Sequence, residues 1–282
     1  MNERPAPLLN SGICTQSQLE SEAFLEWARR LAERPGHMHR KLWEWCFITQ
    51  ALFERNLLAP GVSGLGFAVG TEPLTGFFCS LGASITATDL FSEVAKKRGW
   101  DIANQNASSM ESLNLRGLCP DELFNRNCTF QHVDMTKIPG DLKGFDFIWS
   151  SCALEHLGSL QKGEEFILNA MNCLKPGGFA IHTTEYNFSS NSTTLTSGGT
   201  VLFRRQDIEK IIGKLLRAGH LIDIDYASGD MPLDSYIDLP PYTHDPHIKL
   251  EFEKYVITSI ALIIQKKKSG FGMSMIENVF RH

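Results

Sequence analysis

The stretch Val62-Ser-Gly-Leu-Gly-Phe-Ala-Val-Gly-Thr-Glu-Pro-Leu74 joins a short apolar run to a turn of small residues and then to a helical stretch. Small residues such as Gly66, Ala68 and Gly70 let a ligand approach the backbone closely. Pro73 suits the first turn of the following helix, whose unpaired amide groups are available to a polar ligand. The stretch therefore predicts a strand, a ligand-binding turn and a helix.

The spacing of the small residues narrows the class of ligand. A dinucleotide site has the pattern Gly-x-Gly-x-x-Gly, but counting from Gly64 places Val69 where the third glycine should be. The pattern that fits is Gly-x-Gly/Ala-x-Gly, counted from Gly66. A nucleotide phosphate loop ends in a lysine followed by Ser or Thr, and this turn contains no lysine. The turn therefore favours a ligand that carries no phosphate.

Short apolar runs alternate with helical stretches from residue 61 onward. This alternation predicts an α/β fold, with a doubly wound, seven-stranded, mostly parallel sheet. The last run, 255–265, is expected to pair antiparallel with 220–226 at the sheet edge. The predicted strands are 62–66, 84–88, 129–133, 145–150, 178–184, 220–226 and 255–265. The predicted helices of this part are 71–81, 91–98, 161–174 and 206–218.

The chain divides into three parts. Residues 1–58 are expected to form an N-terminal helical extension, with a flexible lead-in over 1–16 and helices over 17–34 and 38–58. The core spans 59–268 and carries two polar inserts, 186–200 and 227–248, which have the length and composition of substrate loops. Residues 269–282 form a C-terminal tail.

The composition excludes some classes of protein. The net charge of −5 on 282 residues argues against a nucleic-acid-binding face, which needs clustered Lys and Arg. No apolar run reaches the roughly 20 residues of a membrane span, and the N-terminus lacks an apolar signal core. The seven cysteines include no Cys-x-x-Cys pair, which indicates free thiols and not a zinc site. We expect a cytoplasmic protein, and the oligomeric state is left open.

Two acidic residues follow predicted strands in the same region. Asp89 lies about 20 residues after the glycine turn, where a carboxylate can accept hydrogen bonds from ribose hydroxyls. Its alternative role is the N-cap of the predicted helix 91–98. Asp134 follows the strand 129–133 and is placed to accept from an adenine amino group, with Met135 against the ring. Its alternative role is a turn aspartate.

Two further blocks reveal a family resemblance. Gly144-Phe-Asp-Phe-Ile-Trp-Ser-Ser-Cys-Ala-Leu-Glu-His-Leu157 and Leu174-Lys-Pro-Gly-Gly-Phe-Ala-Ile-His182 resemble class I S-adenosylmethionine-dependent methyltransferases, and all the motifs occur in the order of that family. The resemblance spans roughly residues 60–185. It implies the Rossmann-like fold and S-adenosylmethionine as the cofactor. The residues it implies for cofactor binding are Gly64, Gly66, Ala68, Gly70, Glu72, Asp89, Leu90, Asp134, Met135, Ser150 and Ser151.

One position departs from the family pattern. Many members carry an acid where this chain has Gly64, and that acid helps to hold the methionine part of the cofactor. Glu72, on the first turn of the next helix, is the candidate to replace it.

A narrower resemblance concerns the acceptor. Trp149–Gly158, His182–Asn187 and the Leu239-Pro-Pro-Tyr242 segment look similar to methyltransferases associated with bacterial polysaccharide and glycosyl-transfer enzymes. This resemblance implies a small-molecule or glycan acceptor that is methylated on a sugar hydroxyl. The alternatives are another small-molecule acceptor, such as a quinone, lipid or secondary metabolite, and a protein that binds the cofactor without transferring methyl groups.

Two residues are candidates for the catalytic base. His156 follows the fourth core strand, and its ordinary pKa of about 6.5 suits proton abstraction near neutral pH. Glu185 ends the fifth strand, where it can orient a hydroxyl, take its proton or bind a divalent metal. The alternatives are a structural role of Glu155-His156 in the cofactor pocket and a backbone-bound Glu185. His182 is expected in the core, and His244 and His247 are expected to be solvated, so no metal site is predicted.

The shape of the acceptor site separates two of these functions. A wide polar cleft flanked by 186–200 and 227–248 favours a sugar. A long apolar pocket under residues 1–58 favours a lipid-like or quinone-like acceptor.

Overall fold

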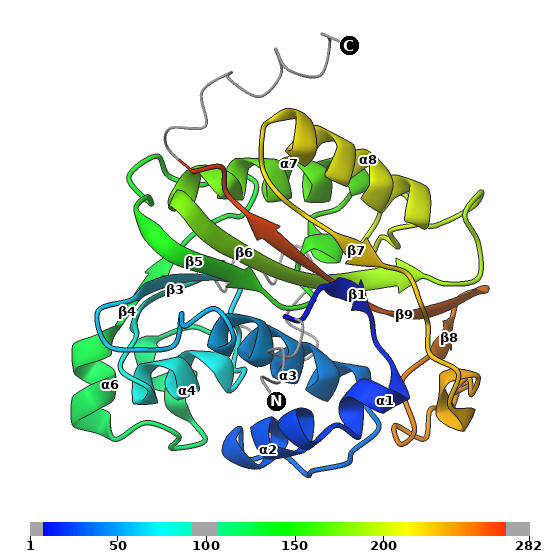
Figure 1. Cartoon of the computed structure of the whole chain (residues 1–282), viewed down its shortest axis with the longest axis horizontal. Coiled ribbons are helices and arrows are strands. Elements are labelled where there is room, and N and C mark those ends of the chain that lie inside the picture. The colour runs from blue at the N-terminus through cyan, green and yellow to red at the C-terminus, as the bar shows by residue number, and fades with distance from the viewer. Residues whose placement is uncertain (1–7, 92–106, 269–282) are drawn as a thin grey trace, which may run out of the picture.

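The computed structural model describes residues 8–91 and 107–268. A mixed sheet of nine strands runs through the middle of the molecule, with helices on both of its faces (Figure 1). Helices α7 and α8 cover one face, and α3, α4 and α6 cover the other, where α2 packs against α3. The α/β prediction is confirmed, while the predicted count of seven strands is wrong.

The strand order is β4-β3-β2-β5-β6-β9-β1-β7, with β8 paired to β9. The first five strands of this order are parallel, and β9 runs antiparallel to β6. The strands are β1 (Ser11–Ile13), β2 (Ser63–Phe67), β3 (Ser84–Asp89), β4 (Cys128–His132), β5 (Phe145–Ser150), β6 (Leu174–Asn187), β7 (Ile224–Asp225), β8 (Leu250–Phe252) and β9 (Tyr255–Gln265).

Polar side chains mark where several helices begin. Thr15, Ser21 and Ser159 lie at N-caps and accept a hydrogen bond from an amide of the first turn. Ser21 separates the predicted helix 17–34 into two. The helices are α1 (Gln16–Leu19), α2 (Glu22–Arg30), α3 (Arg40–Phe53), α4 (Leu74–Ser80), α6 (Asp121–Asn127), α7 (Leu160–Ala170) and α8 (Arg205–Arg217). The predicted helix 91–98 lies, from residue 92 on, outside the described residues.

The N-terminal segment contributes a strand to the sheet. Gly12 pairs with Ala261 of β9 on one side and with Asp225 of β7 on the other. The prediction of a flexible lead-in is therefore wrong for residues 11–13. The expected pairing of 220–226 with 255–265 is reduced to one bridge, Leu221 to Gln265, because β1 occupies the rest of that edge.

Two apolar clusters hold the layers together. One joins α2, α3, α4 and α6 to the sheet, and the other joins α7 and α8 to the opposite face. All seven cysteines are buried and free. Among the described residues, no helix has both the length and the apolar character of a transmembrane span.

Candidate functional site

The predicted site residues gather at one edge of the sheet. The parallel strands β2 to β6 all end at this edge, so the turn after β2, Asp89 at the end of β3 and Ser150 at the end of β5 are brought together. Ligands of open α/β sheets bind outside the carboxyl ends of the strands. The edge is therefore the candidate site.

The glycine turn after β2 has the conformation expected of a ligand-binding turn. Ala68 and Gly70 both have positive φ angles, 48° and 53°. Such a conformation is uncommon for a residue with a side chain, and strained backbone of this kind clusters at functional sites. The amide of Gly70 donates to Asp89 Oδ2 at 3.1 Å, which fixes the turn to the end of β3.

Close packing explains why β2, which leads into the turn, contains two glycines. A Cβ on Gly64 would lie 2.2 Å from Cζ of Phe147, and a Cβ on Gly66 would lie 2.4 Å from the ring of Trp149. Phe147 and Trp149 are fully buried on β5, the parallel neighbour of β2. The departure at Gly64 thus has a physical reason, since an aromatic ring fills the space that an acidic side chain would need.

Asp89 is 4% exposed and is bound by three backbone amides. It accepts from Gly70 and Ala107 at Oδ2 and from Leu90 at Oδ1. Burial raises the pKa of Asp89, and these hydrogen bonds oppose the rise. A carboxylate has about four lone-pair sites, so three amides leave it one more to offer to a ribose hydroxyl.

Asp134, Met135 and Leu90 lie beside this carboxylate. The amide of Val133 donates to the carbonyl of Asp89, which brings the segment after β4 against the end of β3. Leu90 and Met135 are buried, and Asp134 Oδ1 accepts from the amide and hydroxyl of Thr136. The structure therefore places the predicted ribose and adenine residues next to one another.

A cluster of charged residues, which the sequence analysis did not identify, lies where α3 meets the ends of β5 and β6. We call Arg40, Lys41, Glu44 and Glu185 the α3 ion cluster. Arg40 Nη2 lies 2.6 Å from Glu185 Oε1, and Arg40 Nη1 lies 3.5 Å from Glu44 Oε1. The side chains of these three residues are 11%, 8% and 0% exposed respectively, so the charges are paired away from water.

Hydroxyl groups complete the binding of Glu44. Its Oε2 accepts from Thr183 at 2.7 Å and from Ser151 at 3.2 Å, and its Oε1 accepts from Ser259 at 2.5 Å. Burial alone would raise the pKa of Glu44, but the positive charges of Lys41 and Arg40 lower it below its usual value. Glu44 is therefore an ionised anchor that ties α3 to β5, β6 and β9.

Glu185 differs from Glu44 in having an unused oxygen. Its Oε1 is held by Arg40 and by the thiol of Cys152 at 3.6 Å, whereas Oε2 is buried without a hydrogen-bond partner among the described residues. Burial raises the pKa of Glu185, with the charge of Arg40 acting against it. Cys152 itself has a positive φ of 47°, a further sign of strain at the end of β5.

Glu72 also has an unused oxygen. Its Oε2 is buried without a hydrogen-bond partner in the described part of the chain. Burial raises the pKa of Glu72 to about 8, and the positive charge of Lys41 opposes this only in part. A buried acceptor without a donor fits an ammonium group supplied by a ligand.

The remaining predicted residues lie on β5 and after it. Ser150 is fully buried and lies 2.8 Å from Nδ1 of His182, which is 1% exposed, so the prediction of a core position for His182 is confirmed. His156 lies in a short 3₁₀ helix, and its side chain is 40% exposed. Its Nδ1 is 2.9 Å from the carbonyl of Gly199. Because a carbonyl only accepts, Nδ1 donates and Nε2 is the nitrogen that would take a proton.

Comparison with known proteins agrees with this geometry. Residues 64–182 match a family model described as a methyltransferase domain. The match runs from the glycine turn into β6 and agrees with the resemblance to class I S-adenosylmethionine-dependent methyltransferases. The predicted cofactor, S-adenosylmethionine, agrees with this match. No curated protein matches the sequence.

Several solved structures are similar at low identity. Magnesium protoporphyrin IX methyltransferase from Synechocystis PCC 6803, with bound SAH, is 13% identical over 78% of this chain and 80% of that chain, with a TM-score of 0.46. The glycopeptide N-methyltransferase MtfA is 14% identical over 77% of this chain and 94% of that chain, with a TM-score of 0.45. A methyltransferase from Methanosarcina mazei is 13% identical over 77% of this chain and 97% of that chain, with a TM-score of 0.45. These similarities do not bear on the acceptor.

Proposed function

We propose that this protein transfers a methyl group from S-adenosylmethionine to a hydroxyl group of a sugar or glycosylated acceptor. The observation that carries the choice of acceptor is a cavity of about 740 Å³ between the end of β6 and the insert 227–248. Ser189, Ser228, Asp230, Asp234, Ser235 and Lys249 are among its lining residues. Apolar side chains line it as well, among them Met231, Pro232, Ile237 and Val256. A lining that mixes hydroxyls with apolar side chains suits a sugar, whose ring has apolar faces and hydroxyl groups at its edges.

An aromatic face in the same cavity supports this choice. Phe188 is 40% exposed and lines the cavity, with Lys249 Nζ lying 4.0 Å from the centre of its ring. An exposed ring gives an apolar surface on which one face of a sugar can pack. The cavity lies between Phe188–Ser189 and residues 228–237, which is the position expected for a sugar cleft flanked by 186–200 and 227–248.

The residues at the sheet edge fit the cofactor. The glycine turn, Asp89, Leu90, Asp134 and Met135 would hold the adenosine part, and the unpartnered Glu72 would receive the ammonium of the methionine part. When bound, S-adenosylmethionine supplies a sulfonium methyl group that an acceptor oxygen takes up by in-line displacement. The protein has to align the acceptor and remove its proton, and alignment alone contributes about 7–11 kcal/mol.

Glu185 is the residue we assign to the proton. The α3 ion cluster holds Oε1 and so fixes the carboxylate, whereas Oε2 is buried without a hydrogen-bond partner among the described residues and is the oxygen we assign to the acceptor hydroxyl. A base works best when its pKa is raised toward the working pH, and burial acts on Glu185 in that direction. The hydroxyl proton passes to Oε2 as the oxygen gains the methyl group. His156, through Nε2, is the second candidate for this step.

The Glu185→Gln variant tests the assignment. Gln keeps the shape but cannot take the proton, so we expect kcat to fall by about 10²–10⁴-fold while cofactor affinity stays within twofold of wild type. The measurement is release of S-adenosylhomocysteine during a screen of sugar nucleotides and oligosaccharides. His156→Ala is the comparison. If His156→Ala loses turnover and Glu185→Gln keeps it, the proton belongs to His156.

The same screen tests the function itself. Methyl transfer to at least one sugar acceptor is the expected result. Turnover only with quinones or lipids would show that the acceptor is not a sugar. Cofactor binding without turnover on any acceptor would indicate a non-catalytic binding protein.

The Glu72→Gln variant tests whether Glu72 binds the methionine part of S-adenosylmethionine. A hydrogen bond to a charged group contributes about 1.5–3 kcal/mol, so the dissociation constant for S-adenosylmethionine should rise by about 10- to 100-fold. Calorimetric titration of the cofactor gives this value.

The same Glu72→Gln variant should weaken cofactor binding but increase the stability of the cofactor-free protein at raised pH. Because the folded pKa of Glu72 is raised, the folded state holds this proton more tightly than the unfolded state, and stability falls as pH rises from about 4.5 toward about 8. Glu72→Gln has no carboxyl group at this position, so this loss of stability with pH is absent. The stability of the variant relative to wild type should therefore be greater at pH 8 than at pH 5. Equal pH dependence in the two proteins would contradict the burial of an unpaired carboxyl group.

A further inference from the structure

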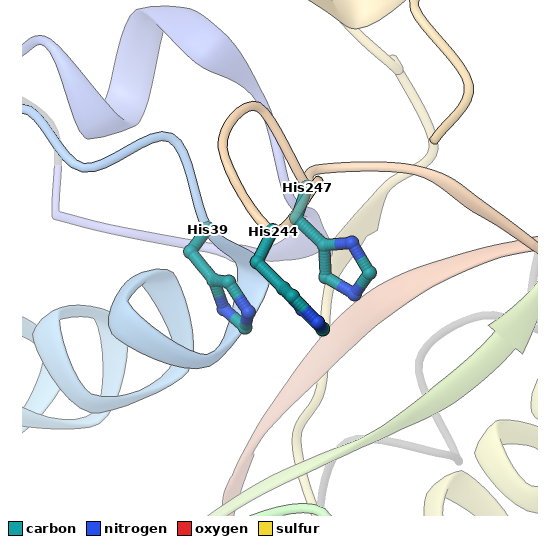
Figure 2. Close-up of side chains that lie close together, drawn as sticks. All are labelled: His39, His244 and His247. Carbon is teal, nitrogen blue, oxygen red and sulfur yellow. The ribbon is translucent and has the colours of Figure 1, made fainter. Parts of the chain in front are cut away.

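Three histidines meet where α3 begins. His39 is the N-cap residue of α3, and His244 and His247 come from the insert 227–248. Figure 2 shows the three rings side by side, between the start of α3 and the loop that carries the other two. One nitrogen of each ring lies within 4.8 Å of the corresponding nitrogens of the other two. The expectation that these loop histidines are solvated is wrong for His247, which is 5% exposed.

A carboxylate orients one of the rings from behind. Asp238 Oδ2 lies 2.6 Å from Nδ1 of His247, so Nδ1 donates and the lone pair of Nε2 faces away from the carboxylate. The same Oδ2 accepts from the amide of His244 at 3.1 Å, which fixes the backbone of the second histidine. Metal-bound histidines almost always donate their other ring nitrogen to such an acceptor.

The two segments are fastened together around the histidines. The amide of Arg40 donates to the carbonyl of His247 at 3.2 Å, and the amide of His247 donates to the carbonyl of Met38 at 2.6 Å. Arg34 forms an ion pair with Asp245, and the ring of His37 binds the carbonyl of His244. The three imidazoles are therefore held near one another by contacts that do not involve their ligand atoms.

From this geometry we infer that His39, His244 and His247 bind one divalent transition-metal ion of the zinc type. Three neutral imidazoles with an open fourth position form a recognised zinc ligand set. Bonds of about 2.0–2.1 Å in a tetrahedral site place neighbouring nitrogens roughly 3.4 Å apart. The nitrogens lie within 4.8 Å of one another, so an ion requires them to come closer, and the exposed side chain of His244 is the one least restricted by packing.

Binding of a metal requires the unprotonated nitrogen of each ring. The amide of Lys41 donates to Nδ1 of His39, so binding through Nε2 moves the ring proton to Nδ1 and gives up this cap bond.

The other compact group of potential ligands is less suited to a cation. Cys152, Glu155 and Glu185 also lie within 4.8 Å of one another, but the guanidinium of Arg40 already binds Glu185. A fixed positive charge in that group repels a metal ion. The histidine site, by contrast, adjoins Arg40 through the backbone, so a bound ion would fix the start of α3 and with it the α3 ion cluster.

Titration of the metal-free, untagged full chain with ZnCl₂, without S-adenosylmethionine, tests the inference. We expect one zinc ion per chain and a rise in melting temperature on binding, because an ion that binds only the folded state stabilises it. CoCl₂ should give the visible absorption of a tetrahedral cobalt site. Absence of saturable binding at one ion per chain would overturn the inference.

Two variants locate the ion without disturbing the fold. His39→Asn keeps a good N-cap, and His244→Asn suits the positive φ of 63° at that position. Loss of an outer partner of a metal site already costs about 10–100-fold in affinity, so each loss of a direct ligand should weaken zinc binding at least tenfold. His220→Gln, at the end of α8, is the matched control and should bind as wild type does. Unchanged affinity in both ligand variants would place the ion elsewhere and refute the assignment.

Discussion

Arg40→Met is expected to lower the free energy of unfolding by about 3–5 kcal/mol, the usual effect of removing one partner from a buried ion pair. Methionine approximates the stem of arginine but leaves Glu185 and Glu44 facing each other without the guanidinium. Both carboxylates are almost completely buried, so water cannot replace the lost charge. Lys41, 3.9 Å from Glu44, compensates for only one of them. Urea unfolding at neutral pH measures the difference.

An exposed pair provides the control for Arg40. Arg29 and Glu26 have side chains that are 57% and 56% exposed, so Arg29→Met should cost less than about 1 kcal/mol. Adding Glu185→Gln to Arg40→Met should restore part of the lost stability, because the double variant removes one unpaired charge. An Arg40→Met protein as stable as Arg29→Met would mean that the α3 ion cluster contributes no net stability.

Gly64→Ala is expected to destabilise the protein by about 3 kcal/mol, at the upper end of the range for overpacked cores. The added methyl group would overlap the ring of Phe147, whose Cζ, Cε2 and Cε1 would lie 2.2, 2.6 and 2.8 Å away. That ring is fully buried and packs against the rings of Phe78 and Trp149, so any movement would disturb both contacts. Thermal or urea unfolding of the cofactor-free protein gives the value.

Gly64→Asp extends this test to the family pattern. It supplies the acid that the resemblance to class I methyltransferases implies at this position, yet the clash should prevent it from strengthening cofactor binding. Gly140→Ala is the control, since nothing lies within 4 Å of a Cβ at Gly140, and its effect should stay within about 0.5 kcal/mol. Tighter cofactor binding by Gly64→Asp would show that the ring of Phe147 moves aside.

The sequence predicted the parts of the fold that repeat a pattern. β2, β3, β5 and β9 were found within one residue of their observed ends, because each is an apolar run bounded by turn residues. α6 was missed, since seven residues, Asp121–Asn127, are too few to show a helical period. β1 was missed because three residues, Ser11–Ile13, carry no alternation, and only pairing with β9 and β7 makes them a strand.

The candidate site was predicted where its residues follow strands in order. Asp89 and Asp134 were located in this way, and the structure brings them together. The α3 ion cluster was not found, because Arg40, Lys41 and Glu44 read as an ordinary charged helix surface until Glu185 is placed against them. The three-histidine site was missed for the same reason, since His39 is distant in sequence from His244 and His247.

The position of β1 has a consequence for how the chain is made. β1 lies between β7 and β9, which are made much later, so this part of the sheet stays open until both of those strands have left the ribosome. Until then β1 lacks one or both of its neighbours, and without β1 the 11-residue apolar strand β9 has an unpaired edge that is a template for pairing with another molecule. Proteolytic removal of Ser11–Ile13, or a fusion that displaces these residues, would expose the edge of β9 again in the folded protein.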